Sequence, residues 1–121
     1  MRRSADGFAR QIARTGIDLS FDREGVVALD GYVERNRTLW SAEDRERMSH
    51  VIGAFVGECM VETYGLVWQG QPDGAPGLGL PFGGVALPIA TALARVGPDG
   101  DASLTSYFDE IGARIATITS P

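Results

Sequence analysis

The sequence predicts an α+β fold in which helices pack on a small three-stranded antiparallel β-meander, in the order α(α)αβββαα. Apolar residues recur at helical spacing on both sides of residues 65–89. Residues 65–89 themselves carry short runs of β-forming residues that are separated by glycine and proline. With 121 residues the chain fits a single domain, 1–121, which is large enough to bury a core.

The N-terminal segment, residues 1–17, has only a weak apolar rhythm at Phe8 and Ile12. We expect either a short helix over residues 5–14 or a loosely packed arm. The segment also holds the basic cluster of the chain, which is either a solvated end or an arm for an acidic partner: Arg2, Arg3, Arg10 and Arg14.

A helix is predicted over residues 22–37, with Ser20 or Asp22 as N-cap and Glu24 in its first turn. Its apolar stripe includes Val26 and Leu29. The opposite face consists of Arg, Asp, Glu and Asn residues, and we expect it to face solvent.

The clearest helix is predicted to begin after Ser41, which is a good N-cap. Asp44 lies three residues further on, where its carboxylate could return the bond as a variant capping box. From Met48 onward the helix is apolar nearly all round, which predicts that this part is enclosed by other elements. Gly65, after Tyr64, is expected to end the helix.

Three short strands are predicted in 65–70, 78–82 and 85–89, and Gly83 and Gly84 form a tight connection between the last two. Prolines limit these strands because they cannot donate to a ladder. We interpret the Gly- and Pro-rich residues 70–84 as a hairpin within one domain and not as a linker between domains.

Two helices are predicted after the strands. The first has Pro88 at its first position and ends at Gly97. The second is capped by Ser103 or Asp101. Its apolar stripe consists of Leu104, Phe108, Ile111 and Ile115.

Composition and charge exclude several classes of protein. The net charge is −5, which disfavours nucleic-acid binding because phosphate contacts need clustered cations. No apolar stretch is long enough for a membrane span or a signal-peptide core, so we expect no membrane association and a cytoplasmic location. The single cysteine excludes an internal disulfide.

The stretch GAFVGE, residues 53–58, raises the question of a functional site. Gly53 and Gly57 lie four residues apart and would allow close approach of a strand or helix, or of a ligand. Glu58 places a carboxylate among apolar residues, where it needs donors. We expect these from backbone N–H groups of the hairpin, from Trp68 Nε1 or from Arg95. The alternatives are a general acid or base in a pocket, and simple exposure.

Glu58, Glu62, His50 and Tyr64 are the candidate catalytic residues. We expect no metal site, because the chain has one histidine and lacks the spacing of zinc-binding helices. Cys59 is expected to be a buried, inert thiol. We expect no cofactor either, because the glycine-rich segment GAPGLGLPFGG lacks the Lys-Ser/Thr end of a phosphate-binding loop.

The stretch GAFVGE on a helix, followed by GLVWQ, a glycine-rich hairpin and LPIATALARV, resembles a group of small bacterial domains of unknown function. These share a G-A-aromatic-x-G-E helix with a nearby Gly and Trp, and the preceding LDGYVERNR is similar to theirs. The resemblance extends over about residues 18–115. The family's Asn-Pro-Phe-like turn reads Leu87-Pro88-Ile89 here, so any role of that Asn is absent. The resemblance implies a fold and transfers no catalytic residues.

Two functions follow as hypotheses. The first is a non-enzymatic protein-binding or regulatory module, for which an immunity-type inhibitor of a basic toxin would fit the acidity of the chain. The alternative is a ligand-binding protein or enzyme that uses Glu58 in a cleft beside the Gly-rich hairpin. A homodimer is a further possibility, because a short meander leaves open strand edges.

Overall fold

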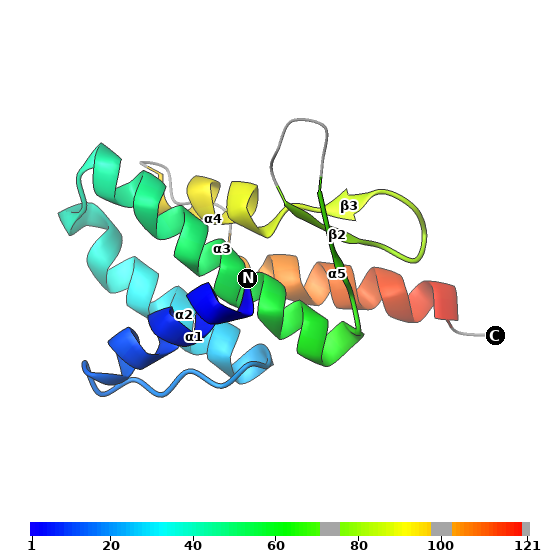
Figure 1. Cartoon of the computed structure of the whole chain (residues 1–121), viewed down its shortest axis with the longest axis horizontal. Coiled ribbons are helices and arrows are strands. Elements are labelled where there is room, and N and C mark those ends of the chain that lie inside the picture. The colour runs from blue at the N-terminus through cyan, green and yellow to red at the C-terminus, as the bar shows by residue number, and fades with distance from the viewer. Residues whose placement is uncertain (71–75, 98–102, 120–121) are drawn as a thin grey trace.

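The computed structural model describes residues 1–70, 76–97 and 103–119, and it confirms the α+β class and the predicted order of elements (Figure 1). The elements of the described residues are α1 (Arg2–Ala13), α2 (Arg23–Asn36), the 3₁₀ turn η1 (Arg37–Leu39), α3 (Ala42–Tyr64), β1 (Trp68–Gln69), β2 (Gly77–Gly79), β3 (Val85–Ala86), α4 (Pro88–Val96) and α5 (Leu104–Thr119).

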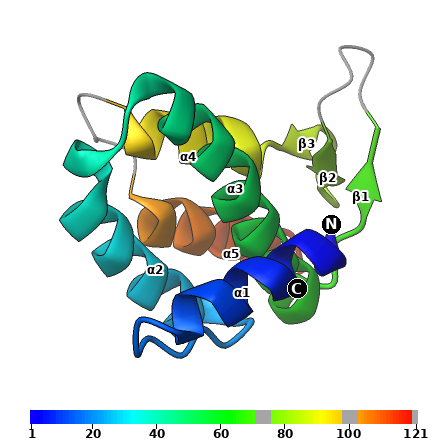
Figure 2. The same ribbon diagram turned by 60° about the vertical axis from the view of Figure 1, so that its left-hand side comes forward.

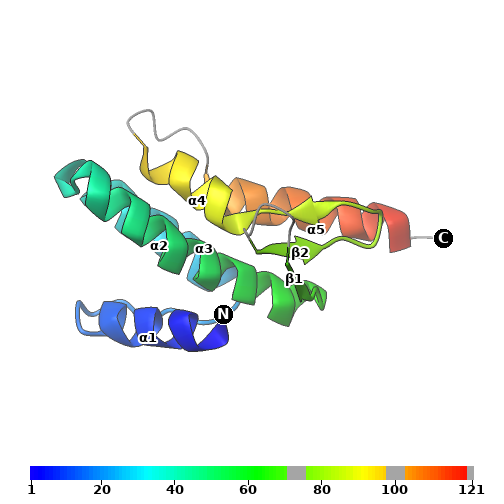
Figure 3. The same cartoon turned by 45° about the horizontal axis from the view of Figure 1, so that its top comes forward.

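Helix α3 is the centre of the structure. It lies between α1 on one side and α4 on the other, and it also packs against α2 and α5 (Figure 3). Residues 52–60 of α3 are buried without interruption, whereas the first two turns are largely exposed. The all-round apolar pattern after Met48 therefore predicted the enclosed part of this helix correctly up to Met60, whereas the last turn, with Glu62 and Thr63 exposed, is not enclosed.

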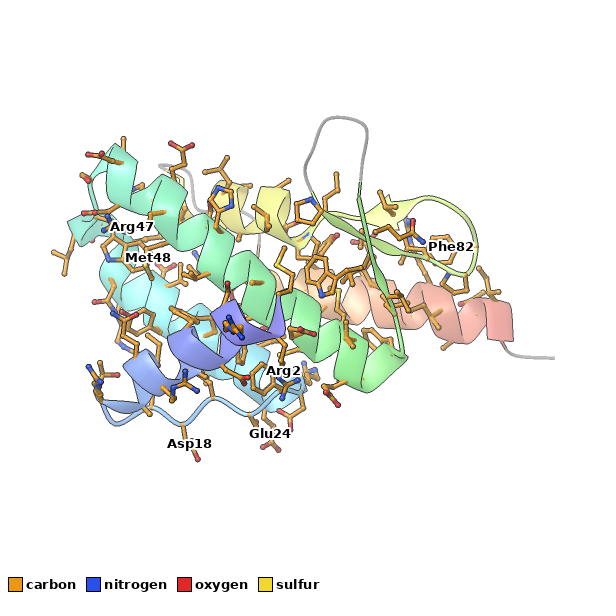
Figure 4. The ribbon with its side chains drawn as sticks, viewed as in Figure 1. Arg2, Asp18, Glu24, Arg47, Met48 and Phe82 are labelled. Atoms are coloured by element: carbon orange, nitrogen blue, oxygen red, sulfur yellow. The ribbon has the colours of Figure 1, made fainter. Side chains whose placement is uncertain are left out.

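The N-terminal segment forms helix α1, which packs against α3. The helix was one of the two predicted alternatives for this segment. Ala5, Phe8 and Ile12 face the core on one stripe of the helix. Arg2 fixes its first turn: the guanidinium lies 3.7 Å from the centre of the Phe21 ring and bonds Glu62. Figure 4 shows the Arg2 side chain directed toward this contact with Phe21 and Glu62.

The predicted helix starts are confirmed by their capping bonds. The Asp22 carboxylate accepts the backbone N–H of Gly25 at 3.1 Å, and the Ser41 hydroxyl accepts that of Asp44 at 3.1 Å. The reciprocal bond of a capping box is not formed, because the Asp44 carboxylate pairs with Arg47 instead. The short turn η1 was not predicted.

The strands form one antiparallel sheet in the order β1-β2-β3, beside α4 and above the outer half of α5 (Figures 1 and 2). Trp68 pairs with Leu78, and Leu78 pairs with Ala86. The strands are shorter than predicted. The β2–β3 turn has φ of 93° at Gly83 and 80° at Gly84, a conformation that favours glycine.

A polar cluster joins α2, α4 and α5. The carboxylate of Asp30 in α2 accepts a hydrogen bond from the buried Arg95 of α4. It also accepts hydrogen bonds from the first backbone N–H groups of α5. Ser103 is also a cap of α5, as predicted, since its hydroxyl accepts the N–H of Ser106; Asp101 lies outside the described residues. The expectation that the polar face of α2 points to solvent was therefore wrong at Asp30.

Candidate functional site

The two glycines of GAFVGE form a tight packing joint. A Cβ atom at Gly53 would lie 2.5 Å from the Ile89 Cα in the first turn of α4, and a Cβ at Gly57 would lie 2.3 Å from the indole ring of Trp68. Neither distance is possible for real atoms, so the missing side chains are what let α4 and β1 approach α3. This agrees with the interpretation in which the two glycines allow the close approach of a strand or helix.

Glu58 is buried, with 6% of the residue exposed, which excludes simple exposure, one of the two alternatives left open for it. Within the described residues none of its three predicted donors is bonded to it, and residues 71–75 of the hairpin lie outside the described part of the chain. Trp68 Nε1 is fully buried and has no hydrogen-bond partner among the described residues, and Arg95 bonds Asp30 and Glu34.

The other three candidates do not converge on Glu58. His50 is exposed on α3, where it lines a shallow surface depression with Glu43, Glu46 and Arg47. Figure 4 places Arg47 near the start of α3, at the end opposite Gly65. Glu62 forms an exposed ion pair with Arg2 at 2.9 Å.

Tyr64 is partly buried, and its hydroxyl donates to the Phe108 carbonyl at 2.8 Å, which ties the end of α3 to α5. Its ring also packs in a tilted arrangement against the ring of Phe108. Burial raises the pKa of Tyr64, so the hydroxyl remains a donor. These contacts assign Tyr64 a packing role.

The thiol and the carboxylates of the described residues form no metal centre. No group of three His, Cys, Asp or Glu side chains in this part of the chain could hold an ion. Cys59 is buried, and burial raises the pKa of its thiol to about 12. The thiol is therefore protonated at neutral pH and is a poor nucleophile.

A cleft of about 650 Å³ does lie beside the hairpin, where a ligand site was expected. It is lined by Tyr64, Gln69 and Ile115 and by the glycine-rich turn between β2 and β3. Glu58, Glu62 and His50 are not among its lining residues. The structure thus brings only one of the four candidates to this cleft.

A different surface stands out on α4. Arg95 is the only ionisable side chain in this helix, and it is buried against Asp30 and Glu34. Ala90, Leu93 and Ala94, which point outward, are exposed and uncharged. We call these three residues, with Leu87 before the helix, the α4 surface.

The α4 surface borders a groove between α4 and α5. The groove has a volume of about 540 Å³ and is lined by Leu87, Ala90, Thr91, Ala94, Ser103, Ser106, Tyr107 and Glu110. Leu87 is 39% exposed and Leu93 49% exposed. Among the described residues of the lining, Glu110 is the one that is charged, and it is paired with Arg114. A charge-free apolar face of this kind is unusual for a helix at the periphery of the structure (Figure 2).

Sequence reasoning did not identify the α4 surface, although its signal was present. PIATALARV contains a single charge in nine residues, which is the pattern of an enclosed helix. The other α-helices carry several charges each. The prediction of a helix there was correct, but the exposed, charge-free side of that helix was not predicted.

A comparison with protein-family models finds no match to this chain, and comparisons with curated proteins and with solved structures find none either. Within the described residues, no helix combines the length and apolar character of a membrane span. The resemblance to a group of bacterial domains stays a prediction.

Proposed function

We propose that this protein is a protein-binding module that acts through the α4 surface. The observation that carries the proposal is the outward side of α4, where Ala90, Leu93 and Ala94 face solvent and the one charged residue of the helix, Arg95, is buried on the other side. Contiguous exposed apolar residues next to a groove mark protein interaction sites. Interface centres are also depleted of charged residues.

The comparison with α3 supports this proposal. Both helices are apolar nearly all round in part of their length, and in α3 that part is covered on every side. Helix α4 is covered by α3 and partly by α5, and its remaining side is open. A partner protein would complete for α4 the burial that the fold provides for α3.

Site-specific photo-cross-linking in the cells that make the protein tests the proposal. A photoreactive phenylalanine analogue is placed at position 93 and, as the matched control, at position 39, where Leu39 is 77% exposed outside the α4 surface. We expect a discrete protein adduct from position 93 and none from position 39. No adduct at position 93, or the same adducts at both positions, would refute the proposal.

A further inference from the structure

We propose that the cleft beside the β2–β3 turn binds a small uncharged molecule that carries a carboxamide group on a planar apolar body. We call this site the hairpin cleft. It is separate from the α4 surface, because no residue of that surface lines it. The proposal therefore goes beyond the protein-binding function and does not depend on it.

The hairpin cleft has the size of a ligand site. Its volume of about 650 Å³ lies within the range of roughly 300–1,000 Å³ that is usual for small-molecule pockets. Three parts of the fold line it, namely the end of α3 with the segment that leads into β1, the β2–β3 turn, and α5 (Figure 1). Such a meeting point of separate elements is a common place for a small-molecule site.

The position of the Gln69 side chain in the cleft is determined by a glycine. The strand register pairs Gln69 with Gly77, which places Gly79 on the same face of the sheet. Trp68 and Leu78 alternate with these residues and face the core. A Cβ atom at Gly79 would collide with the carboxamide nitrogen of Gln69, so the carboxamide lies directly over this glycine and within the cleft.

The Gln69 carboxamide is available to a ligand. The residue is exposed, and within the part of the chain that the structure describes its carboxamide has no hydrogen-bond partner. A carboxamide presents N–H donors and a carbonyl acceptor side by side. It therefore pairs with a second carboxamide through two hydrogen bonds, one in each direction. This complementarity is what narrows the class of ligand.

The other lining residues favour an uncharged ligand with an apolar body. Among the described residues of the lining, Tyr64 is the one that can ionise, and its hydroxyl already donates to the Phe108 carbonyl. A charged ligand would lose hydration there without gaining a counter-ion. The Tyr64 ring, Leu80 and Ile115 supply apolar surface against which a flat body packs.

A magnetic-resonance titration of the isotope-labelled chain with benzamide tests the proposal. Benzamide joins a carboxamide to a flat apolar ring, and benzoate, which carries a carboxylate instead, is the matched probe. We expect benzamide to shift the signals of the Gln69 side-chain amide and of Gly83 and Gly84 saturably, with a Kd of about 1–10 mM, as befits so small a ligand. Benzoate should bind at least about tenfold more weakly.

Two variants test the role of the carboxamide. Gln69→Ala removes it, and Gly79→Ala displaces it, because the new methyl group takes its place while the flexible end of the Gln69 side chain moves aside. Each should weaken benzamide binding at least about fivefold. Gln11→Ala, at an exposed position of α1, is the matched control and should leave the affinity unchanged. Unchanged amide signals from α1 and α3 show that each variant is folded.

Several results would overturn the proposal. One is the absence of saturable shifts up to about 20 mM benzamide. The others are equal affinities for benzamide and benzoate, shifts confined to residues outside the cleft, and an affinity that Gln69→Ala leaves unchanged. None of these results bears on the α4 surface, because the cross-link from position 93 is measured independently.

Discussion

Asp30, in the middle of α2, caps a helix that lies more than seventy residues away in the chain. Its carboxylate accepts the Thr105 backbone N–H at 2.8 Å and the Thr105 hydroxyl at 2.6 Å. It also accepts the Leu104 N–H at 3.0 Å and Arg95 Nε at 3.2 Å. One side chain thereby holds the N-terminus of α5 and the cation of α4, and it satisfies donors that the start of a helix otherwise leaves unpaired.

Replacing Asp30 with Asn should destabilise the protein by about 2–4 kcal/mol at pH 7, because it removes the better buried of the two carboxylates that bond Arg95 and weakens the cap of α5. Equilibrium urea denaturation measures this loss. Asp18→Asn is the matched control, since the exposed Asp18 side chain points into solvent (Figure 4) and its removal should change stability by less than about 0.5 kcal/mol. Equal effects of the two substitutions would contradict the capping role.

The same carboxylate predicts a pH dependence. Burial acts to raise the pKa of Asp30, but the bonds from Thr105, Leu104 and Arg95 outweigh it and hold the pKa below its ordinary value of 3.8. An acid with a depressed pKa stabilises the fold above its unfolded pKa, and the contribution is lost as pH falls through the folded value. The difference in unfolding free energy between wild type and Asp30→Asn should therefore be constant from pH 5 to 7 and shrink below pH 4. A difference that grows in acid would refute this assignment.

The main helices could be predicted from the sequence because their signals are local. Ser41 and Gly65 bound α3 through capping bonds to near neighbours, and the apolar pattern between them reports its burial. The strands were less predictable, since β1 and β3 have two residues each and their ends depend on pairing with β2. Their extents follow from contacts across the sheet.

The candidate site was predictable only in part, because its polar contacts are long-range. The close approach at Gly53 and Gly57 follows from the absence of side chains, and it was foreseen. Among the described residues, none of the donors expected for Glu58 bonds it, and one of them, Arg95, bonds Asp30, which lies 65 positions before it. Pairings at such separation leave no pattern in a single sequence.

A glycine-to-alanine substitution in the joint between α3 and α4 should have the opposite effect on stability to the same substitution at an open position of α1. Gly53→Ala would place a Cβ 2.5 Å from the Ile89 Cα, and because a backbone atom cannot move aside alone, α4 must shift. We expect a loss of about 2–3 kcal/mol in unfolding free energy. Gly7→Ala in α1 meets nothing within 4 Å and should gain about 0.5–1 kcal/mol through helix propensity. Chemical denaturation of both variants distinguishes packing from propensity, and a stabilising Gly53→Ala would exclude the tight joint.

The thiol of Cys59 should be unreactive in the folded protein. Its pKa of about 12 and its burial in α3 keep it protonated and screened from reagents at pH 8. A thiol reagent that releases a coloured product should release none over minutes from the protein in native buffer. In concentrated guanidinium it should release one equivalent per chain. Thr38→Cys, at an exposed position, supplies the positive control and should react at once. Rapid native labelling of the wild type would show that α3 opens locally.

Glu58→Gln tests whether the carboxylate of the GAFVGE helix serves folding. The residue is 6% exposed, and none of its predicted donors among the described residues bonds it, so its removal breaks no hydrogen bond there. We expect unfolding free energy at pH 7 to stay within about 0.5 kcal/mol of the wild type or to rise. Tyr64→Phe, which removes the bond to the Phe108 carbonyl, is the matched comparison and should lose about 1 kcal/mol. A loss at Glu58 larger than that at Tyr64 would mean that the carboxylate holds a hydrogen-bonded partner in solution, and it would restore the clamp that the sequence suggested.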